Sequence, residues 1–223
     1  MFAEPKKIVL CGGARTPIGH IARSFSALRP EDLLTAALEA VFARTALKKD
    51  AVDGLIVGWV GQSFSAPNIA RVAALKVGLP EKTSAVTVQN NCVSSIEAVA
   101  AAARCIIAGE GELYLAGGTE SMSRLPYTID GSRAAKPLRS LSVVREKWGE
   151  LLSSPEAAVV DSIEQGLTDP VKGINMAGTA EVCAQMFAVT REEQDDYARE
   201  SFRRTIAGWN EGFYASHVVP VGN

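Results

Sequence analysis

Cys92 is the residue with the clearest potential for covalent chemistry. It follows a short β-rich run at 84–88 and precedes an Ala-rich apolar segment at 93–108, so we expect it where a strand gives way to a helix. Free amide groups at a helix N-terminus favour a thiolate, which is the nucleophilic form of cysteine. Ligands also bind at the carboxyl ends of strands in open parallel sheets. The position suits a nucleophile, but a buried structural cysteine remains open from the pattern alone.

The other three cysteines fit structural roles. Cys105 stands beside two isoleucines inside the same helical pattern, which predicts a core residue. Cys11 would end a strand and Cys183 lies in another Ala-rich helical segment. No two cysteines form a C-x-x-C pair, so we expect reduced thiols, no disulfide framework, no metal site and a cytoplasmic protein.

The chain offers no evident base for a cysteine nucleophile, which usually needs one within hydrogen-bond reach. Its only histidines are His20, in a glycine-flanked loop, and His217, before a final extended segment. Neither has a motif around it, so both are expected to be surface imidazoles. The sequence therefore supplies a nucleophile without its activator.

Two features raise the question of a phosphate site. The pairs Gly12–Gly13 and Gly117–Gly118 each follow a predicted strand, but neither completes G-x-G-x-x-G or leads directly into a helix, which excludes a dinucleotide site of that type. Basic residues gather within 133–147, at Arg133, Lys136, Arg139, Arg145 and Lys147. This cluster suits an anionic ligand such as a phosphorylated cofactor, and equally a solvated loop surface.

The elements that must position Cys92 alternate between strand and helix. Strands are predicted at 6–11, 54–60, 84–88 and 112–116, and helices at 30–47, 68–77 and 93–108. This order predicts an α/β fold with a largely parallel sheet covered on both faces. The helix at 93–108 is apolar nearly all round, so we expect it in the interior. Farther along, helices are expected at 179–188 and 190–207, with an extended piece at 218–221. The character of the sequence changes after about residue 120, because residues 121–170 are rich in Ser, Arg, Pro and Gly and show little periodicity.

Composition narrows the classes of function. The 223 residues are 47% hydrophobic, which supports a packed core and excludes a disordered chain. The net charge of −2, from 23 basic and 25 acidic residues, gives no basic excess for nucleic acid or a membrane surface. Charged residues and glycines interrupt the apolar stretches, so no membrane span of about 18 residues is expected. The first residues lack a signal-peptide core.

Five segments, taken in chain order, resemble the thiolase family, whose members make or cleave β-ketoacyl-CoA. The resemblance covers essentially the whole chain, and its most specific parts are the stretches G-G-x-E-S-M-S and M-x-x-T-A-E. The matching segments are RTPIG at 15–19, NCVSSIEA at 91–98, AGGTESMS at 116–123, NMAGTAE at 175–181 and TREEQD at 190–195.

The resemblance implies a thiolase-like layered α/β/α fold. Residues 1–120 correspond to an incomplete N-terminal core domain, and residues 121–223 correspond to an α-rich loop domain that covers the active site and holds coenzyme A. Cys92 corresponds to the acylated nucleophile of a ping-pong reaction, with CoA thioesters as substrates and no separate cofactor. Met176 matches a methionine of the acyl pocket, and Asn175 stands where many members have histidine. Glu120 and Ser121 are expected to shape a strand end and a subunit interface.

The sequence also departs from the family pattern. Val93 follows the cysteine where many members have glycine, and Gln89 stands where asparagine is common. The family's second half supplies a Gly-His-Pro histidine, an Asn-Glu-x-Phe loop and a second cysteine in Cys-x-Gly-Gly, and this sequence contains none of these motifs.

The resemblance therefore implies the N-terminal half of an acetyl-CoA acyltransferase of fatty acid metabolism, working in a dimer or tetramer with a complementary C-terminal half. Two alternatives are a condensing enzyme of the β-ketoacyl synthase kind, which would prefer acyl-carrier-protein thioesters, and a non-catalytic acyl-CoA-binding or assembly subunit.

Overall fold

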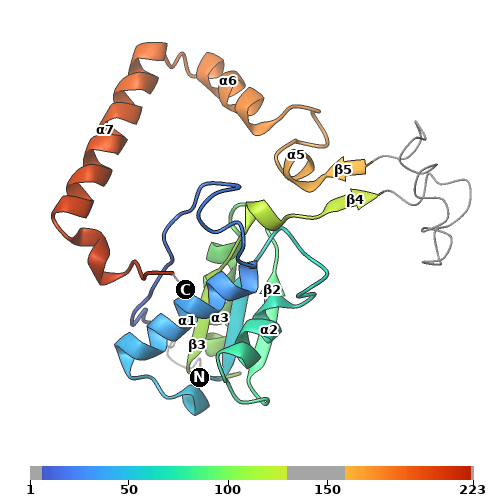
Figure 1. Ribbon diagram of the computed structural model, residues 1–223, viewed down its shortest axis with the longest axis vertical. Helices are drawn as coiled ribbons and strands as arrows, with labels where there is room; N and C mark the ends of the chain where they lie inside the picture. The colour runs from blue at the N-terminus through green and yellow to red at the C-terminus, as the bar shows by residue number, and fades with distance from the viewer. Residues whose placement is uncertain (1–6, 130–158, 222–223) are drawn as a thin grey trace, which may run out of the picture. The chain divides into compact units, whose positions relative to one another are not determined.

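The structure, a computed structural model, describes residues 7–129 and 159–221 (Figure 1). Contacts between its residues divide the chain into two compact units. The first unit comprises Met1–Arg124 together with Glu192–Asn223, and the second comprises Leu125–Arg191. The basic cluster within 133–147 lies outside the described residues, so its predicted role in anion binding stays a prediction.

A three-stranded parallel sheet forms the centre of the first unit. Its strands are β1 (Gly54–Gly58), β2 (Ser84–Val88) and β3 (Tyr114–Gly118), in the spatial order β2-β1-β3. Gly58 of β1 pairs with Val88 and Gly118, the last residues of its two neighbours, so the three carboxyl ends align at one edge. Every residue of β1 is buried, as the central strand of a sheet covered on both faces should be. The predicted parallel α/β core is confirmed.

Three helices cover this sheet, α1 (Pro30–Thr45), α2 (Ile69–Lys76) and α3 (Ser94–Ala108). All three lie within one or two residues of their predicted bounds because their ends are encoded locally. The Asn68 side chain caps α2 by accepting a hydrogen bond from the third amide of the helix. Gly109 ends α3 in the left-handed conformation, with φ of 81°.

Alternate side chains of β1 connect the sheet to the helices on its two faces. Leu55 and Val57 belong to the larger core cluster, which includes the buried residues of α1 and α2. Ile56 points the other way, into a smaller cluster with Ala98 and Ala102 of α3. The result is a layered arrangement with α1 and α2 on one face of the sheet and α3 on the other (Figure 1).

The remaining described elements are two short strands, three α-helices and several 3-10 helices. In the second unit, β4 (Tyr127–Ile129) pairs antiparallel with β5 (Val159–Asp161). This unit also contains α5 (Ser162–Gly166) and α6 (Met176–Met186). The 20-residue helix α7 (Arg191–Asn210) belongs to the first unit except for its first residue. Within residues 7–129 and 159–221, the 3-10 helices are η1 (Lys49–Ala51), η2 (Met122–Arg124) and η4 (Phe213–Ser216).

The segment after α7 is tied to the beginning of the chain. The backbone amide of Arg15 donates to the carbonyl of His217 at 2.8 Å, and the amide of Val219 donates to the carbonyl of Arg15 at 2.9 Å. The guanidinium of Arg44 donates to the carbonyl of Val218 at 3.2 Å. These bonds explain why the C-terminal residues group with the first unit. The predicted division into functional domains at residue 120 stays a prediction.

The strand predicted at 6–11 is wrong for its described part, since 7–11 form no strand. Val9 and Leu10 are 62% and 86% exposed. Residues of high β propensity form a strand only where a neighbouring strand supplies hydrogen-bond partners. Among the described residues, the nearest pairing is a single bridge between Arg15 and Val218.

The prediction that α3 lies wholly in the interior is also wrong. Its buried residues, Ser94, Ala98 and Ala102, form a narrow stripe of small side chains against the sheet. On its outer side, Ile96 and Ile107 are 71% and 63% exposed. A sheet covers only one side of a helix, and no described element packs against the other side.

One described segment, Asn91–Ala108, is long and apolar enough by length and composition to cross a membrane, where the sequence predicted none. It contains Glu97 and Arg104, which form an ion pair with each other. The same test is passed by helices in the cores of proteins outside membranes, so this finding is weak evidence for a span.

Candidate active site

The loop between β2 and α3 places Cys92 at the aligned carboxyl ends of the parallel strands. Cys92 lies four residues after the end of β2 at Val88 and two residues before the start of α3 at Ser94, and it is exposed. The preceding residue, Asn91, has a positive φ of 46°, so the chain turns sharply just before the cysteine. The predicted location between strand and helix is confirmed, and the role of Cys92 as nucleophile stays a prediction.

Two glycines let the start of α3 approach the strand ends closely. A Cβ atom on Gly58 would lie 2.3 Å from the carbonyl carbon of Ser94 and 2.5 Å from the amide nitrogen of Ser95. A Cβ atom on Gly118 would lie 2.0 Å from the hydroxyl of Ser95. Gly58 was not among the residues predicted to build the site, although a glycine at the end of a buried strand indicates close backbone approach. These close contacts set the distance between the strand ends and the start of α3, which directly follows the Cys92 loop.

The first turn of α3 presents free amide groups beside the Cys92 loop. The amide of Ser94 donates to the carbonyl of Asn91, and that of Glu97 donates to the carbonyl of Val93. Between them, the amides of Ser95 and Ile96 find no acceptor among the described residues. Such amides at a helix N-terminus carry partial positive charge and favour an anionic group nearby.

The carboxylate of Glu120 braces the loop that follows β1. Its two oxygens accept hydrogen bonds from the Trp59 indole at 3.2 Å and from the amides of Val60 and Gly61 at 3.2 and 3.1 Å. Ser121 is buried, with its hydroxyl 3.4 Å from the carbonyl of Leu28. The expectation that Glu120 shapes a strand end is confirmed, while its place in a subunit interface stays a prediction.

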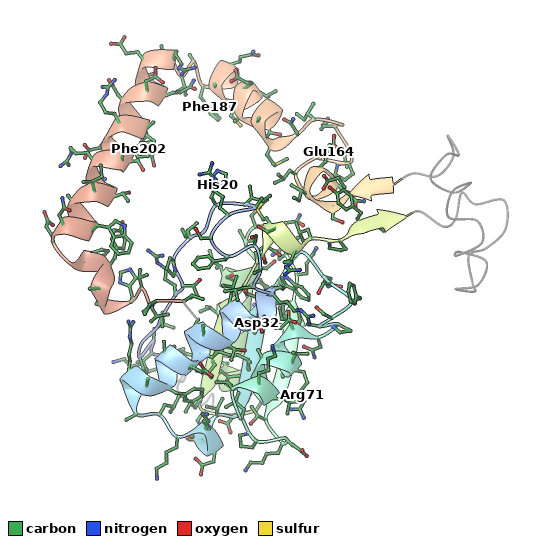
Figure 2. The ribbon with its side chains drawn as sticks, viewed as in Figure 1. His20, Asp32, Arg71, Glu164, Phe187 and Phe202 are labelled. Carbon is green, nitrogen blue, oxygen red and sulfur yellow. The ribbon has the colours of Figure 1, made fainter. Side chains whose placement is uncertain are left out.

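No described residue makes a hydrogen bond with the thiol of Cys92. His20, labelled in Figure 2, lies in the exposed loop before α1, with Nδ1 3.0 Å from the carbonyl of Ile21. His217 is half-buried rather than a surface imidazole, because its ring packs edge-on against Phe213 and Tyr214. Neither histidine is placed as a base for the cysteine.

Of the remaining cysteines, only Cys105 differs from Cys92 in its exposure. Cys105 packs beside the smaller core cluster, as predicted. Burial raises the pKa of its thiol, and a hydrogen bond and the charge of Glu110 raise it further, so this thiol resists ionisation. Cys11 and Cys183 are exposed. In the described part of the chain, no group of three or more His, Cys, Asp and Glu side chains could hold a metal ion.

Asn175 and Met176, the predicted substrate-binding residues, belong to the second unit, whereas Cys92 belongs to the first. Asn175 caps α6, because its side-chain oxygen accepts a hydrogen bond from the amide of Gly178 at 2.8 Å. Met176 begins the helix, and its side chain is 44% exposed. An exposed apolar side chain beside a capped helix start is compatible with substrate contact, which stays a prediction.

Comparison with known proteins gives a consistent result. The family model for the thiolase N-terminal domain matches residues 8–223. A probable acetyl-CoA acyltransferase of Staphylococcus aureus (strain COL) is 34% identical over 215 residues, which cover 96% of this chain and 51% of that protein. A 3-oxoadipyl-CoA/3-oxo-5,6-dehydrosuberyl-CoA thiolase of Escherichia coli (strain K12) is 34% identical over 218 residues, covering 97% of this chain and 52% of that protein.

Solved structures agree with the sequence comparison. The acetyl-CoA acetyltransferase of Bacillus anthracis superposes with a TM-score of 0.81 at 29% identity, over 95% of this chain and 50% of that one. Human mitochondrial 3-ketoacyl-CoA thiolase, solved in complex with CoA, gives 0.81 at 30% identity, over 94% of this chain and 50% of that one. The chain thus spans about half the length of the relatives it matches. With its layered α/β fold and its match to the N-terminal domain over residues 8–223, this chain belongs to the thiolase family.

Proposed function

We propose that this chain is the N-terminal half of a thiolase, transferring acyl groups between CoA thioesters through an acyl-enzyme on Cys92. The observation that carries the proposal is the placement of an exposed cysteine at the carboxyl ends of parallel strands, beside free amides of a helix N-terminus. The free amides carry partial positive charge beside the cysteine loop, and the exposure of Cys92 lets a bulky thioester reach it.

In the thiolysis direction, the Cys92 thiolate attacks the keto carbonyl of a β-ketoacyl-CoA and forms a sulfur–carbon bond. The bond between the keto carbon and the neighbouring methylene carbon then breaks, and its electron pair stays on the methylene carbon of the departing acetyl-CoA. That carbon takes up a proton. A CoA thiolate next attacks the acyl group on Cys92, which releases acyl-CoA and restores the cysteine thiolate. Asn175 and Met176 are proposed to contact the acyl-CoA.

Protonation of the departing carbon needs an acid and deprotonation of the incoming CoA thiol needs a base, and the described residues place neither on the Cys92 thiol. We therefore propose that a complementary C-terminal half supplies these groups. The chain's coverage of only about half of its relatives supports this assignment. The outer side of α3 supports it as well, since Ile96 and Ile107 are exposed in a pattern typical of a helix that packs on both sides.

Thiolysis of acetoacetyl-CoA tests the proposal. We expect the 223-residue chain alone to show less than one-tenth of the turnover of a two-half thiolase, and the chain with its complementary half to gain activity that Cys92→Ala abolishes. Turnover by the chain alone within about tenfold of the complete enzyme would contradict the need for the second half.

A surface substitution tests where the second half binds. Ile96→Glu places a charge on the exposed side of α3, so it should leave the folding of the chain unchanged and weaken association with the complementary half. The matched control is Leu75→Glu on α2, since Leu75 is also exposed, at 48%. Equal association of the two variants, measured by size-exclusion chromatography, would count against docking on α3.

A further inference from the structure

We propose that Ser94 is the positioning residue for Cys92: its buried hydroxyl holds the cysteine loop in the one conformation that presents the thiol at the strand ends. This inference rests on the proposed nucleophilic role of Cys92. It concerns a residue that contacts neither the thiol nor, in the proposal, the substrate, and that acts only through the backbone of the loop.

The hydroxyl of Ser94 bonds to both residues that precede the cysteine. It accepts a hydrogen bond from the amide of Asn90 at 2.8 Å and donates one to the carbonyl of Asn91 at 2.6 Å. The side chain is 4% exposed, so water does not compete for these bonds. This one hydroxyl group thereby holds the loop from its buried side, while Cys92 lies on the exposed side.

The backbone around Ser94 supplies the rest of the restraint. Its amide donates to the carbonyl of Asn91 at 3.1 Å, and the amide of Val93 donates to the carbonyl of Asn90 at 3.1 Å. The carbonyl carbon of Ser94 is the atom that a Cβ on Gly58 would meet first. Ser94 is therefore anchored to the sheet on one side and to the cysteine loop on the other.

The loop needs such a restraint because little else fixes its conformation. Asn91 adopts a positive φ of 46°, which asparagine tolerates better than most residues, so this turn is accessible to the chain without being the only turn available to it. Cys92 and Val93 are exposed, so no burial of their side chains fixes the loop. Without the Ser94 hydroxyl, the amide of Asn90 loses its acceptor and the loop is free to adopt other turns.

The test compares Ser94→Ala with a control that removes a buried hydroxyl at the other end of β2. Thr83 is 4% exposed, and its hydroxyl donates to the carbonyl of Val52 at 3.2 Å, so Thr83→Val loses a similar bond far from the cysteine. Two readouts on the full chain are the rate of Cys92 alkylation by iodoacetamide, followed by peptide mass spectrometry, and hydrogen exchange of the Asn90 amide.

Ser94→Ala should slow Cys92 alkylation and speed Asn90 exchange by about tenfold each, the factor expected when two ordinary hydrogen bonds are lost. Thr83→Val should change neither by more than about twofold, because its lost bond lies at the far end of the strand. In acetylation of Cys92 by acetyl-CoA, Ser94→Ala should lower the maximal rate and leave the half-saturating concentration unchanged.

Wild-type alkylation of Cys92 in Ser94→Ala would overturn the inference, as would an equal loss in Thr83→Val. If Ser94→Ala does not fold, Ser94→Thr and Ser94→Val are compared instead. The threonine and valine side chains have nearly the same shape, and only threonine carries the hydroxyl. The threonine variant should then alkylate about tenfold faster than the valine variant, and equal rates would overturn the inference. If the wild-type chain is not acetylated on Cys92 in the presence of its complementary half, the proposed function is contradicted, while alkylation and exchange still decide the role of Ser94.

Discussion

Replacing Gly58 by alanine tests whether the start of α3 is held directly against the strand ends. The added Cβ would lie 2.3 and 2.5 Å from the carbonyl carbon and oxygen of Ser94 and 2.5 Å from the amide nitrogen of Ser95. All three atoms are backbone, so no side chain can rotate away and either α3 or β1 must move. Overpacking of a core commonly costs about 1–3 kcal/mol, and we expect about 3 kcal/mol or more because the obstacle is backbone.

Gly117→Ala is the matched control on the neighbouring strand. A Cβ there meets nothing within 4 Å, and its backbone does not require a positive φ. This change should be neutral or stabilise the fold by up to about 1 kcal/mol, since alanine reduces the entropy of the unfolded chain. Urea unfolding and thermal unfolding, each followed by circular dichroism, give the free energy of unfolding and the melting temperature of both variants. The two melting temperatures should differ by about 6–12 °C, and free energies of unfolding within about 1 kcal/mol of each other would refute direct backbone packing.

Two further predictions concern side chains that hold the core together. Asn68→Ala removes the cap of α2 and should lower the free energy of unfolding by about 1–2 kcal/mol in urea titrations, whereas Asn68→Asp keeps the acceptor for Arg71 and should lose less. The Asp53 carboxylate accepts hydrogen bonds from the amides of Glu112 and Leu113, which lower its pKa. Its contribution is therefore present above its unfolded pKa of about 3.9 and is lost as pH falls through the lower folded pKa. Asp53→Asn should be less stable than the parent by under about 1 kcal/mol at pH 7, and a gap that stays constant down to pH 2 would argue against this coupling.

Much of the fold of the first unit could be predicted from sequence because its signals are local. Short β-rich runs at 54–60 and 84–88 predicted β1 and β2. The acidic turn after Pro30 predicted the start of α1, where the Asp32 carboxylate accepts a hydrogen bond from the Arg29 amide at 3.1 Å. The failures at 6–11 and on the outer side of α3 share one cause. An apolar segment reveals that it prefers burial, but it does not reveal whether a partner is present to bury it.

The position of the candidate site could be predicted from the sequence, but the contacts that hold it in place could be predicted only in part. The predicted change from strand to helix located Cys92, and the motifs of the thiolase family indicated its role as a nucleophile. The sequence did not reveal that the Ser94 hydroxyl closes the cysteine loop, because this requires the turn with a positive φ at Asn91. It also did not reveal that Gly58 sets the distance between this loop and the sheet, because Gly58 and Ser94 are 36 positions apart in the chain. Interactions of that kind depend on tertiary geometry, which spacing along the chain does not encode.

The central claim is that Cys92 carries the acyl group, and one measurement tests it directly. The chain is incubated with acetyl-CoA together with its complementary half, digested without reducing agents or strong base, and examined by peptide mass spectrometry. The account predicts an acetyl group on the Cys92 peptide that disappears when CoA is added, with no acetyl group on the equally exposed Cys183. An unmodified Cys92, or equal labelling of Cys92 and Cys183, would contradict the account.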